Sequence, residues 1–173
     1  HTASNWSPSG VPGAGCDVVI NNAANMAVDA DTNEVNSWNM TSYTGTLSGS
    51  SNITVTVASG TSTVLFAGTS NTWSGTLTLK PAAGTTINLT SGGMTTWNGL
   101  TVTGTTTGAV YMLDGLTLAA TKILTLTSGT LHTDGASDNS GLTHSWGTFS
   151  SNNTNTRAVY LGNSNITITQ NFS

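Results

Sequence analysis

Charged side chains are scarce in this sequence. Only 6% of its 173 residues are Asp, Glu, Lys or Arg, whereas about a quarter is usual for a globular domain. The three basic residues, Lys80, Lys122 and Arg157, lie far apart in the chain, and the formal net charge is −4. Binding to phosphates needs clustered basic side chains. We therefore predict that nucleic acid is not a partner.

Other features that would indicate a function are also missing. Cys16 is the single cysteine, so no disulfide can form within the chain. No apolar run approaches the roughly 18 residues of a membrane-spanning helix, and we predict no membrane span. The sequence contains no Gly-x-Ser-x-Gly elbow, phosphate-binding loop or paired-cysteine motif, and its seven acidic residues are scattered. We predict a protein that is not an enzyme and has no cofactor.

What the sequence does contain is short segments in which Thr alternates with aliphatic residues. Alternation is typical of half-buried strands, and no segment keeps a helical period. Four such segments start 23, 24 and 24 residues apart: ITVTV from Ile53, TLTL from Thr76, LTVT from Leu100 and LTLT from Leu124. We assign ITIT from Ile166 to the same series, with GTFSS from Gly147 as a weaker strand between them.

A second set of strand-like segments lies within these intervals. They are TVLFAG from Thr63, TINLT from Thr85 onward, AVYML from Ala109, GTLHT from Gly129 and RAVYLG from Arg157. A period in the twenties, with two or three short strands per repeat and Gly, Ser and Asn at the bends, is typical of a β-solenoid. We predict an all-β fold, a parallel β-helix or solenoid with coils of about 24 residues. A β-sandwich is the alternative.

A Trp-x-Gly phrase also recurs. Trp73 and Trp97 are 24 residues apart, and each precedes a glycine by two residues. We predict that these rings pack at the corners of the coils while Gly75 and Gly99 make the bends. Trp146, which comes directly before Gly147, is given the same role. The alternative interpretation is that the rings are platforms for stacking sugars.

The chain divides into two parts on this pattern. Residues 1–50 do not follow the repeat, and we predict that they form an N-terminal cap. Residues 51–173 are predicted to form the coils of one structural domain. The last alternating strand carries no charge that would repel a neighbouring strand, so we predict that it pairs with another subunit. The alternative is that further coils or another domain follow it in the native protein. The residues of this assembly strand are Asn165, Ile166, Thr167, Ile168, Thr169 and Phe172.

Two groups of polar residues are candidate ligand sites. His132, Asp134, Asp138 and His144 lie in the segment HTDGASDNSGLTH, where they could bind a divalent metal or supply the two carboxylates of a glycosidase. An exposed polar loop is the simpler interpretation. Asp29, Asp31 and Asn33 alternate as calcium ligands would, but the glycine and the distal glutamate of an EF-hand loop are missing.

Surface Thr and Asn residues allow two further interpretations. Outward Thr pairs predict a Thr ladder, which on a flat face could order water and bind ice; Thr is also simply a good strand former. The ladder residues are Thr54, Thr56, Thr76, Thr78, Thr101, Thr103, Thr125, Thr127, Thr167 and Thr169. Glycosylation is allowed by seven Asn-x-Ser/Thr sequons, at Asn5, Asn39, Asn52, Asn88, Asn152, Asn165 and Asn171, about the number that chance would give.

The phrases NWSPSGVPGAGCDVVI, AVDADTNEVNSWNM, YTGTL, LTLTSGTLHTDG and GTFSSNNTNTRAVYLGNSNITIT resemble repetitive secreted parallel β-helix proteins of cell surfaces and phage fibres. The resemblance spans most of the chain, and its motifs are structural. It implies a surface, fibre or adhesive element. In that family a cysteine such as Cys16 often has a partner about ten residues later, near Ala27. No such partner is present here, so we expect Cys16 to be a small buried residue; the alternative is a link between molecules.

These observations predict a non-enzymatic structural subunit of an extracellular fibre or filament, located outside the cell, at the cell surface or on a virion. The chain begins with His1 rather than Met, which is consistent with a processed N-terminus. We expect the subunit to bind copies of itself head to tail, and surface glycans are a second expected partner. A glycan-binding or glycan-cleaving module is the alternative function, and ice binding is a third.

Overall fold

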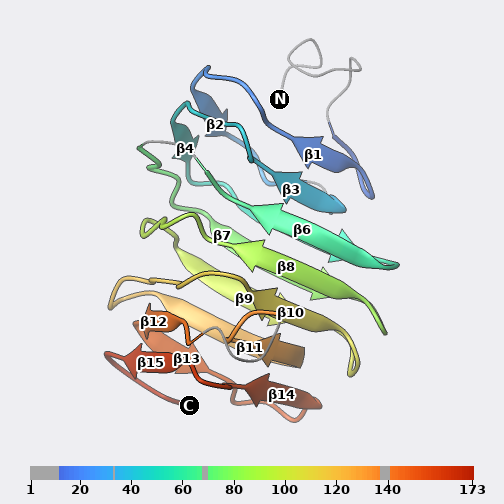
Figure 1. The fold of residues 1–173 in the computed structure, drawn as a ribbon, viewed down its shortest axis with the longest axis vertical. Helices are drawn as coiled ribbons and strands as arrows, with labels where there is room; N and C mark the ends of the chain where they lie inside the picture. Colours follow the sequence, from blue (N-terminus) through green and yellow to red (C-terminus); the bar gives the residue numbers. More distant parts are fainter. Residues whose placement is uncertain (1–11, 33, 68–69, 137–140) are drawn as a thin grey trace.

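The computed structural model describes residues 12–32, 34–67, 70–136 and 141–173. Over these residues the protein is all-β, with no helix, and parallel coils about 24 residues apart stack into a β-solenoid, as Figure 1 shows. Every strand pairing between the described elements is parallel. The sandwich alternative is therefore wrong, because sandwich strands pair in an antiparallel manner.

The first face of the solenoid is a ladder that runs through almost its whole length. Its strands, in spatial order, are β1 (Asp17–Val19), β3 (Ser37–Asn39), β6 (Thr61–Leu65), β8 (Thr86–Thr90), β10 (Ala109–Met112), the second half of β11 (Ile123–His132) and β14 (Arg157–Tyr160). Successive strands belong to successive coils, so each inner strand is hydrogen-bonded to the coil before it and the coil after it.

Two other faces complete each coil. The second face contains β5 (Ile53–Val57), β7 (Thr76–Pro81), β9 (Gly99–Thr103), the first half of β11 and β13 (Thr148–Ser150). The third face has two strand pairs, β2 (Met26–Val28) with β4 (Leu47–Gly49), and β12 (Thr143–Trp146) with β15 (Asn165–Ile168). Within the described residues, no helix is both long and apolar enough to cross a membrane.

The core is made of aligned columns of inward side chains. On the second face the register places Leu77 beside Leu100 and Leu100 beside Leu124, and all three are fully buried. Thr78 and Thr101, which follow Leu77 and Leu100 in sequence, point outward and pair with each other. Because alternate side chains of a strand point to opposite faces, a sequence period near 24 becomes a continuous apolar column.

The predicted corner tryptophans form the centre of the core. The ring of Phe66 lies 5.6 Å from that of Trp73 and 4.9 Å from that of Trp97, measured between centroids, and both indoles are fully buried. The Nε1–H of Trp73 donates a hydrogen bond of 2.8 Å to the carbonyl oxygen of Ser51 in the preceding coil. Gly75 passes so close to that carbonyl that a Cβ atom would overlap it. The Nε1–H of Trp97 instead donates to the carbonyl oxygen of Met94, and Gly99 lies against the carbonyl of Ile123.

One sequence assignment is wrong. Ile166 does not continue the column of Leu100 and Leu124; it lies on the third face, where it pairs with His144. For the same reason Thr167 and Thr169 do not extend the outer Thr ladder of the second face. The outer Thr column of the second face instead continues from Thr125 to Ser150 in β13. The alternation in ITIT correctly indicated a strand but not the face to which it belongs.

The segment predicted to be an N-terminal cap contains further coils. β1 and β3 continue the ladder of the first face, and β2 and β4 pair on the third. Val35 forms a parallel bridge with Val55 on the second face. The described part of residues 1–50 thus follows the coil path, with shorter strands than the later coils. That residues 1–50 cover the first coil remains a prediction.

We expect replacement of an inward leucine in the middle of a column to destabilise the whole solenoid. Leu100→Ala removes a fully buried side chain with neighbours in both adjacent coils and should lower the free energy of unfolding by about 2–5 kcal/mol. Thr101→Ala, on the outer side of the same strand, is the control and should cost much less. Denaturant titration followed by tryptophan fluorescence measures both; equal losses would contradict the inward column.

Candidate functional site: the open coil at the C-terminal end

The residues proposed as a metal or carboxylate site are not brought together. His144 points into the core and is buried, whereas the ring of His132 lies on the outer side of β11 between two tyrosines. Asp134 is buried, and Asp138 lies outside the described residues. Within the described part of the chain, no three His, Cys, Asp or Glu side chains are placed so that they could hold a metal ion.

His144 is a structural residue of the core. Its Nδ1 accepts a hydrogen bond of 3.1 Å from the backbone N–H of Leu116, so Nε2 carries the proton and donates to the carbonyl oxygen of Thr133 at 2.6 Å. Burial lowers the pKa of His144, and the bond to Thr133 and the charge of Asp114 offset this only in part. The imidazole is therefore held neutral and joins two neighbouring coils.

Asp134 is buried at the corner that follows His132. Only 1% of its surface is exposed, and neither carboxylate oxygen has a hydrogen-bond partner. Its carboxylate packs against Gly162 of the next coil, where a side chain would overlap it. This corner therefore depends on a glycine in the last coil.

The calcium-like segment is used for packing between coils. The carboxylate of Asp31 accepts hydrogen bonds from the backbone N–H and the side-chain amide of Asn52, at 2.7 and 3.4 Å. Asp29 is exposed, and Asn33 lies outside the described residues. The expectation that Cys16 is buried is wrong: it is exposed, because it lies beside β1 in the first described coil.

The predicted corner tryptophans are buried, whereas the described asparagines of the glycosylation sequons lie at the surface. Trp73, Trp97 and Trp146 are at most 2% exposed, so none of these rings can stack on a sugar in this conformation. The described sequon asparagines Asn52, Asn152, Asn165 and Asn171 are exposed, and Asn39 and Asn88 are partly exposed on the outer side of strands; Asn5 lies outside the described residues.

The Thr ladder forms one continuous column on the second face. Thr54, Thr78, Thr101 and Thr125 are neighbours in successive coils. The adjacent outer column is not uniform, because Thr56 pairs with Lys80, whose ammonium forms an ion pair with Glu34. The second face therefore presents one row of hydroxyl and methyl groups beside a row that includes a salt bridge.

The most distinctive surface is the coil made by β14, β15 and the residues up to Phe172. In the described residues no strand pairs with the outer edges of β14 and β15. Its inward side chains stand in the same columns as fully buried ones: Val159 beside Leu131, Ile166 beside His144, Ile168 beside Trp146 and Phe172 beside Phe149. We call this surface the open coil.

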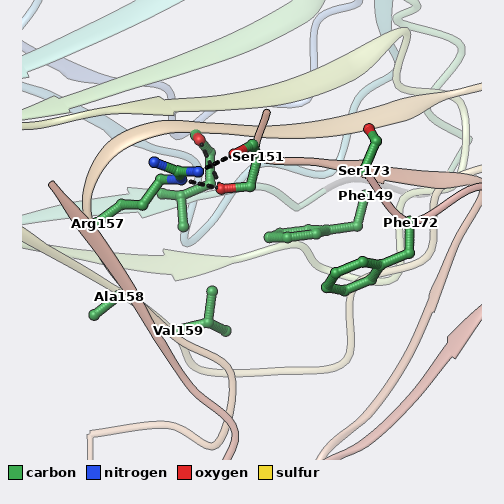
Figure 2. Close-up of a pocket in the computed structure, with 8 residues that line it drawn as sticks. Phe149, Ser151, Arg157, Ala158, Val159, Phe172 and Ser173 are labelled. Atoms are coloured by element: carbon green, nitrogen blue, oxygen red, sulfur yellow. Dashed lines mark hydrogen bonds between the residues drawn. The ribbon is translucent and has the colours of Figure 1, made fainter. Parts of the chain in front are cut away.

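A cavity of about 460 Å³ lies within the open coil. Figure 2 shows the rings of Phe149 and Phe172 side by side, with Val159 opposite them. The two ring centroids are 5.2 Å apart, and Phe172 is 75% exposed. Leu126 lies among the residues that line the cavity. The cavity is the uncovered end of the same apolar columns that form the core.

Arg157 forms the polar side of the cavity. Its guanidinium donates to the carbonyl and hydroxyl oxygens of Ser151, to Oδ1 of Asn153 at 3.3 Å and to the carbonyl of Asn155 at 2.6 Å; Figure 2 shows the contact with Ser151. All these acceptors are neutral. The described residues therefore fix the position of a positive charge at the edge of the open coil without supplying a negative partner.

An aromatic column lies beside the cavity on the outer side of the first face. The ring of His132 is stacked between Tyr111 and Tyr160, with centroid distances of 4.1 and 4.7 Å. Tyr160 ends the column and is 55% exposed. One face of its ring therefore lies against His132, and the opposite face points away from the coils.

Sequence reasoning identified only part of this surface. The predicted assembly strand, residues 165–169, and Phe172 do lie on the open coil, but Arg157, Val159, Tyr160 and Leu161 were not singled out. A signal for them was present. AVYM at Ala109–Met112 and AVYL at residues 158–161 are nearly the same sequence, and the register places them in the same columns two coils apart.

The chain has no match to a protein-family model, a curated protein or a solved structure. The fold and the contacts described above therefore carry the functional argument.

We expect the neutral state of His144 to make stability depend on pH. In the unfolded chain this histidine binds a proton below about pH 6.5, its ordinary pKa, whereas the folded chain resists protonation. Stability should therefore fall as the pH falls through this range. In His144→Gln the slope of unfolding free energy between pH 7.5 and 5.5 should be smaller than in the wild type. An unchanged slope would contradict the buried neutral imidazole.

Proposed function

We propose that this protein is a non-enzymatic structural subunit that assembles end to end into an extracellular filament through its open coil. The β-solenoid fold is consistent with a structural or repetitive module, and each coil of a solenoid is stabilised by its neighbours. In this proposal the open coil acquires its missing neighbour from another subunit, by pairing of backbone edges and covering of apolar side chains. A head-to-tail contact between different ends propagates without closing on itself.

The observation that carries the proposal is the repeated AVYM/AVYL sequence. In β10, which has a paired strand on each side, Val110 and Met112 are at most 1% exposed. In β14, which has one paired strand, Val159 is partly buried and Leu161 is 51% exposed. The same side chains thus occupy the same columns in two environments. The sequence of β14 is suited to a position between two coils.

The composition supports this proposal and an extracellular location. The assembly strand and Phe172 contain no charged residue, and the one Lys, Arg, Asp or Glu after Asp138 is Arg157. Natural sheet proteins usually protect exposed edges with charge, above all with Lys. An edge without this protection favours pairing. A surface of Thr, Ser and Asn rather than Lys and Glu suits a secreted fibre, whose adhesion to other surfaces would be delegated to those side chains.

Electron microscopy across a concentration series tests the assembly. We expect the wild-type protein to form regular filaments whose width matches a single solenoid, and deletion of residues 165–173 to abolish them. A milder variant, Phe172→Glu, places a charge on the exposed ring position of the open coil and should shift filament formation to at least tenfold higher protein concentration.

The matched control is Ile123→Glu. Ile123 is 45% exposed on the second face, in the middle of the solenoid, so the substitution makes the same type of change away from the open coil. Its filaments should be normal, and the thermal unfolding of both point variants should resemble that of the wild type. Monomers at all concentrations of the wild-type protein, or equal effects of the two substitutions, would refute the proposal.

A further inference from the structure

At each end of the first-face ladder lies a strand that, within the described part of the chain, is paired on one side only. β14 pairs with β11 on one side, and β1 pairs with β3 on one side. Among the described residues, neither strand has a ladder partner on its other side. All seven strands of this ladder are parallel and follow the same direction around the coil. A second copy placed after β14 would therefore present β1 in the direction that the ladder requires.

The register of the ladder determines which residues would meet. Tyr160, His132, Tyr111 and Asn88 form one outward column, and Asn88 pairs with Thr63. Continuing the pairing of Trp38 with Val64 by one residue brings Ser37 beside Thr63, and Ser37 pairs with Asp17. Asp17 is thus the N-terminal member of the column that ends at Tyr160.

The neighbouring inward column can be followed in the same way from Val159 to the N-terminal end of the ladder. Val159, Leu131, Val110, Ile87 and Ser62 follow one another in it. The hydroxyl of Ser62 donates to the carbonyl of Asn36, and the N–H of Asn36 donates to the carbonyl of Cys16 at 2.8 Å. The same register therefore places Cys16 at the N-terminal end of the column that ends at Val159.

The charges of the two ends are complementary. Four of the seven acidic residues lie from Asp17 to Glu34, and no Lys or Arg precedes Lys80, which forms an ion pair with Glu34, so no Lys or Arg lies near the three aspartates in sequence. At the other end, the acceptors that the described residues offer to the guanidinium of Arg157 are all neutral. Opposite charges on two surfaces favour their association and orient it. The partner that this distribution fits is the N-terminal coil of another copy.

The carboxylate of Asp17 retains an acceptor for such a contact. Oδ1 accepts two hydrogen bonds of 2.7 Å, from the side chains of Asn36 and Ser37, which lower the pKa of Asp17 and keep it ionised. Oδ2 accepts none from the described residues. In the column of Tyr160, Asp17 would stand on the outer side of the ladder, whereas Arg157 lines the cavity on the inner side of β14.

We propose that the N-terminal coil of a second copy docks on β14 in the register of the internal ladder, so that its Cys16 lies beside Val159 and its Asp17 beside Tyr160. This inference rests on the end-to-end assembly proposed above and specifies its partner strand and register. Parallel strands in a sheet are about 4.8 Å apart, within the range of Cα separations that a disulfide can bridge. The single native cysteine therefore makes the register directly measurable.

The test uses Val159→Cys in the otherwise unchanged chain. Assembled protein is exposed to dissolved oxygen, which takes up the two electrons and two protons released when two thiols form a disulfide. We expect a ladder of covalent dimers, trimers and larger oligomers on a non-reducing gel, which collapses to monomer on reduction. Cys16→Ser combined with Val159→Cys should give no species larger than a dimer.

Ala158→Cys is the matched control. Ala158 points to the opposite side of β14 from Val159 and would stand beside Gly15 rather than Cys16 in this register. We expect at least a tenfold lower yield of covalent oligomers from this variant. For Val159→Cys, mass spectrometry of the excised bands should identify a disulfide between Cys16 of one chain and the thiol introduced at position 159 of another.

The outcomes separate the register from the assembly. Filaments of Val159→Cys that do not cross-link, or that cross-link less well than Ala158→Cys, would overturn the register and leave the end-to-end assembly standing. Absence of filaments in the wild type and in both variants would overturn the two proposals together. Normal filaments with efficient linkage only through position 159 would support both.

Discussion

Parallel pairing between successive coils is the interaction on which this structure depends. A single coil of about 24 residues contains strands of three to six residues, except that β11 has ten and spans two faces, and these strands pair with strands of the neighbouring coils. The backbone N–H and C=O groups of a strand point alternately to the coil before it and the coil after it, so all of them are satisfied only when both coils are present. The same stacking turns isolated Leu, Val and Ile side chains into buried columns, so hydrogen bonding and apolar burial favour one arrangement.

The period of the sequence contains most of this information. Leu77, Leu100 and Leu124 could be aligned by counting, because a strand alternates strictly and a coil returns to the same face after a fixed path. The Trp-x-Gly phrase was equally informative, since Trp73 needs a backbone carbonyl for its indole N–H and Gly75 leaves the room for that carbonyl. Where spacing is regular, the sequence is sufficient to predict the fold.

Prediction failed where alternation was followed in place of spacing. Steps of about 24 residues from Leu124 lead to Phe149 and Phe172, the partners that the register gives, whereas Ile166 was assigned to this face because ITIT alternates like the other strands. His144 occupies an inward position that a pattern of apolar residues cannot reveal, because its burial depends on hydrogen bonds to Leu116 and Thr133 from neighbouring coils. The open coil was recognised only in part. AVYL and AVYM have nearly the same sequence, and AVYM is buried because a strand pairs on each side of it, which its own sequence does not reveal.

The one-sided support of β14 and β15 also has a consequence for the order of folding. In a stack in which each coil contacts only its neighbours, structure can begin at any point and spread, and the buried aromatic group of Phe66, Trp73 and Trp97 is one place where it could begin. Among the described residues β14 and β15 pair on one side only, so this coil should form late and open early. Amide hydrogens of Val159 and Ile166 should therefore exchange with solvent before those of Val110 or Leu100.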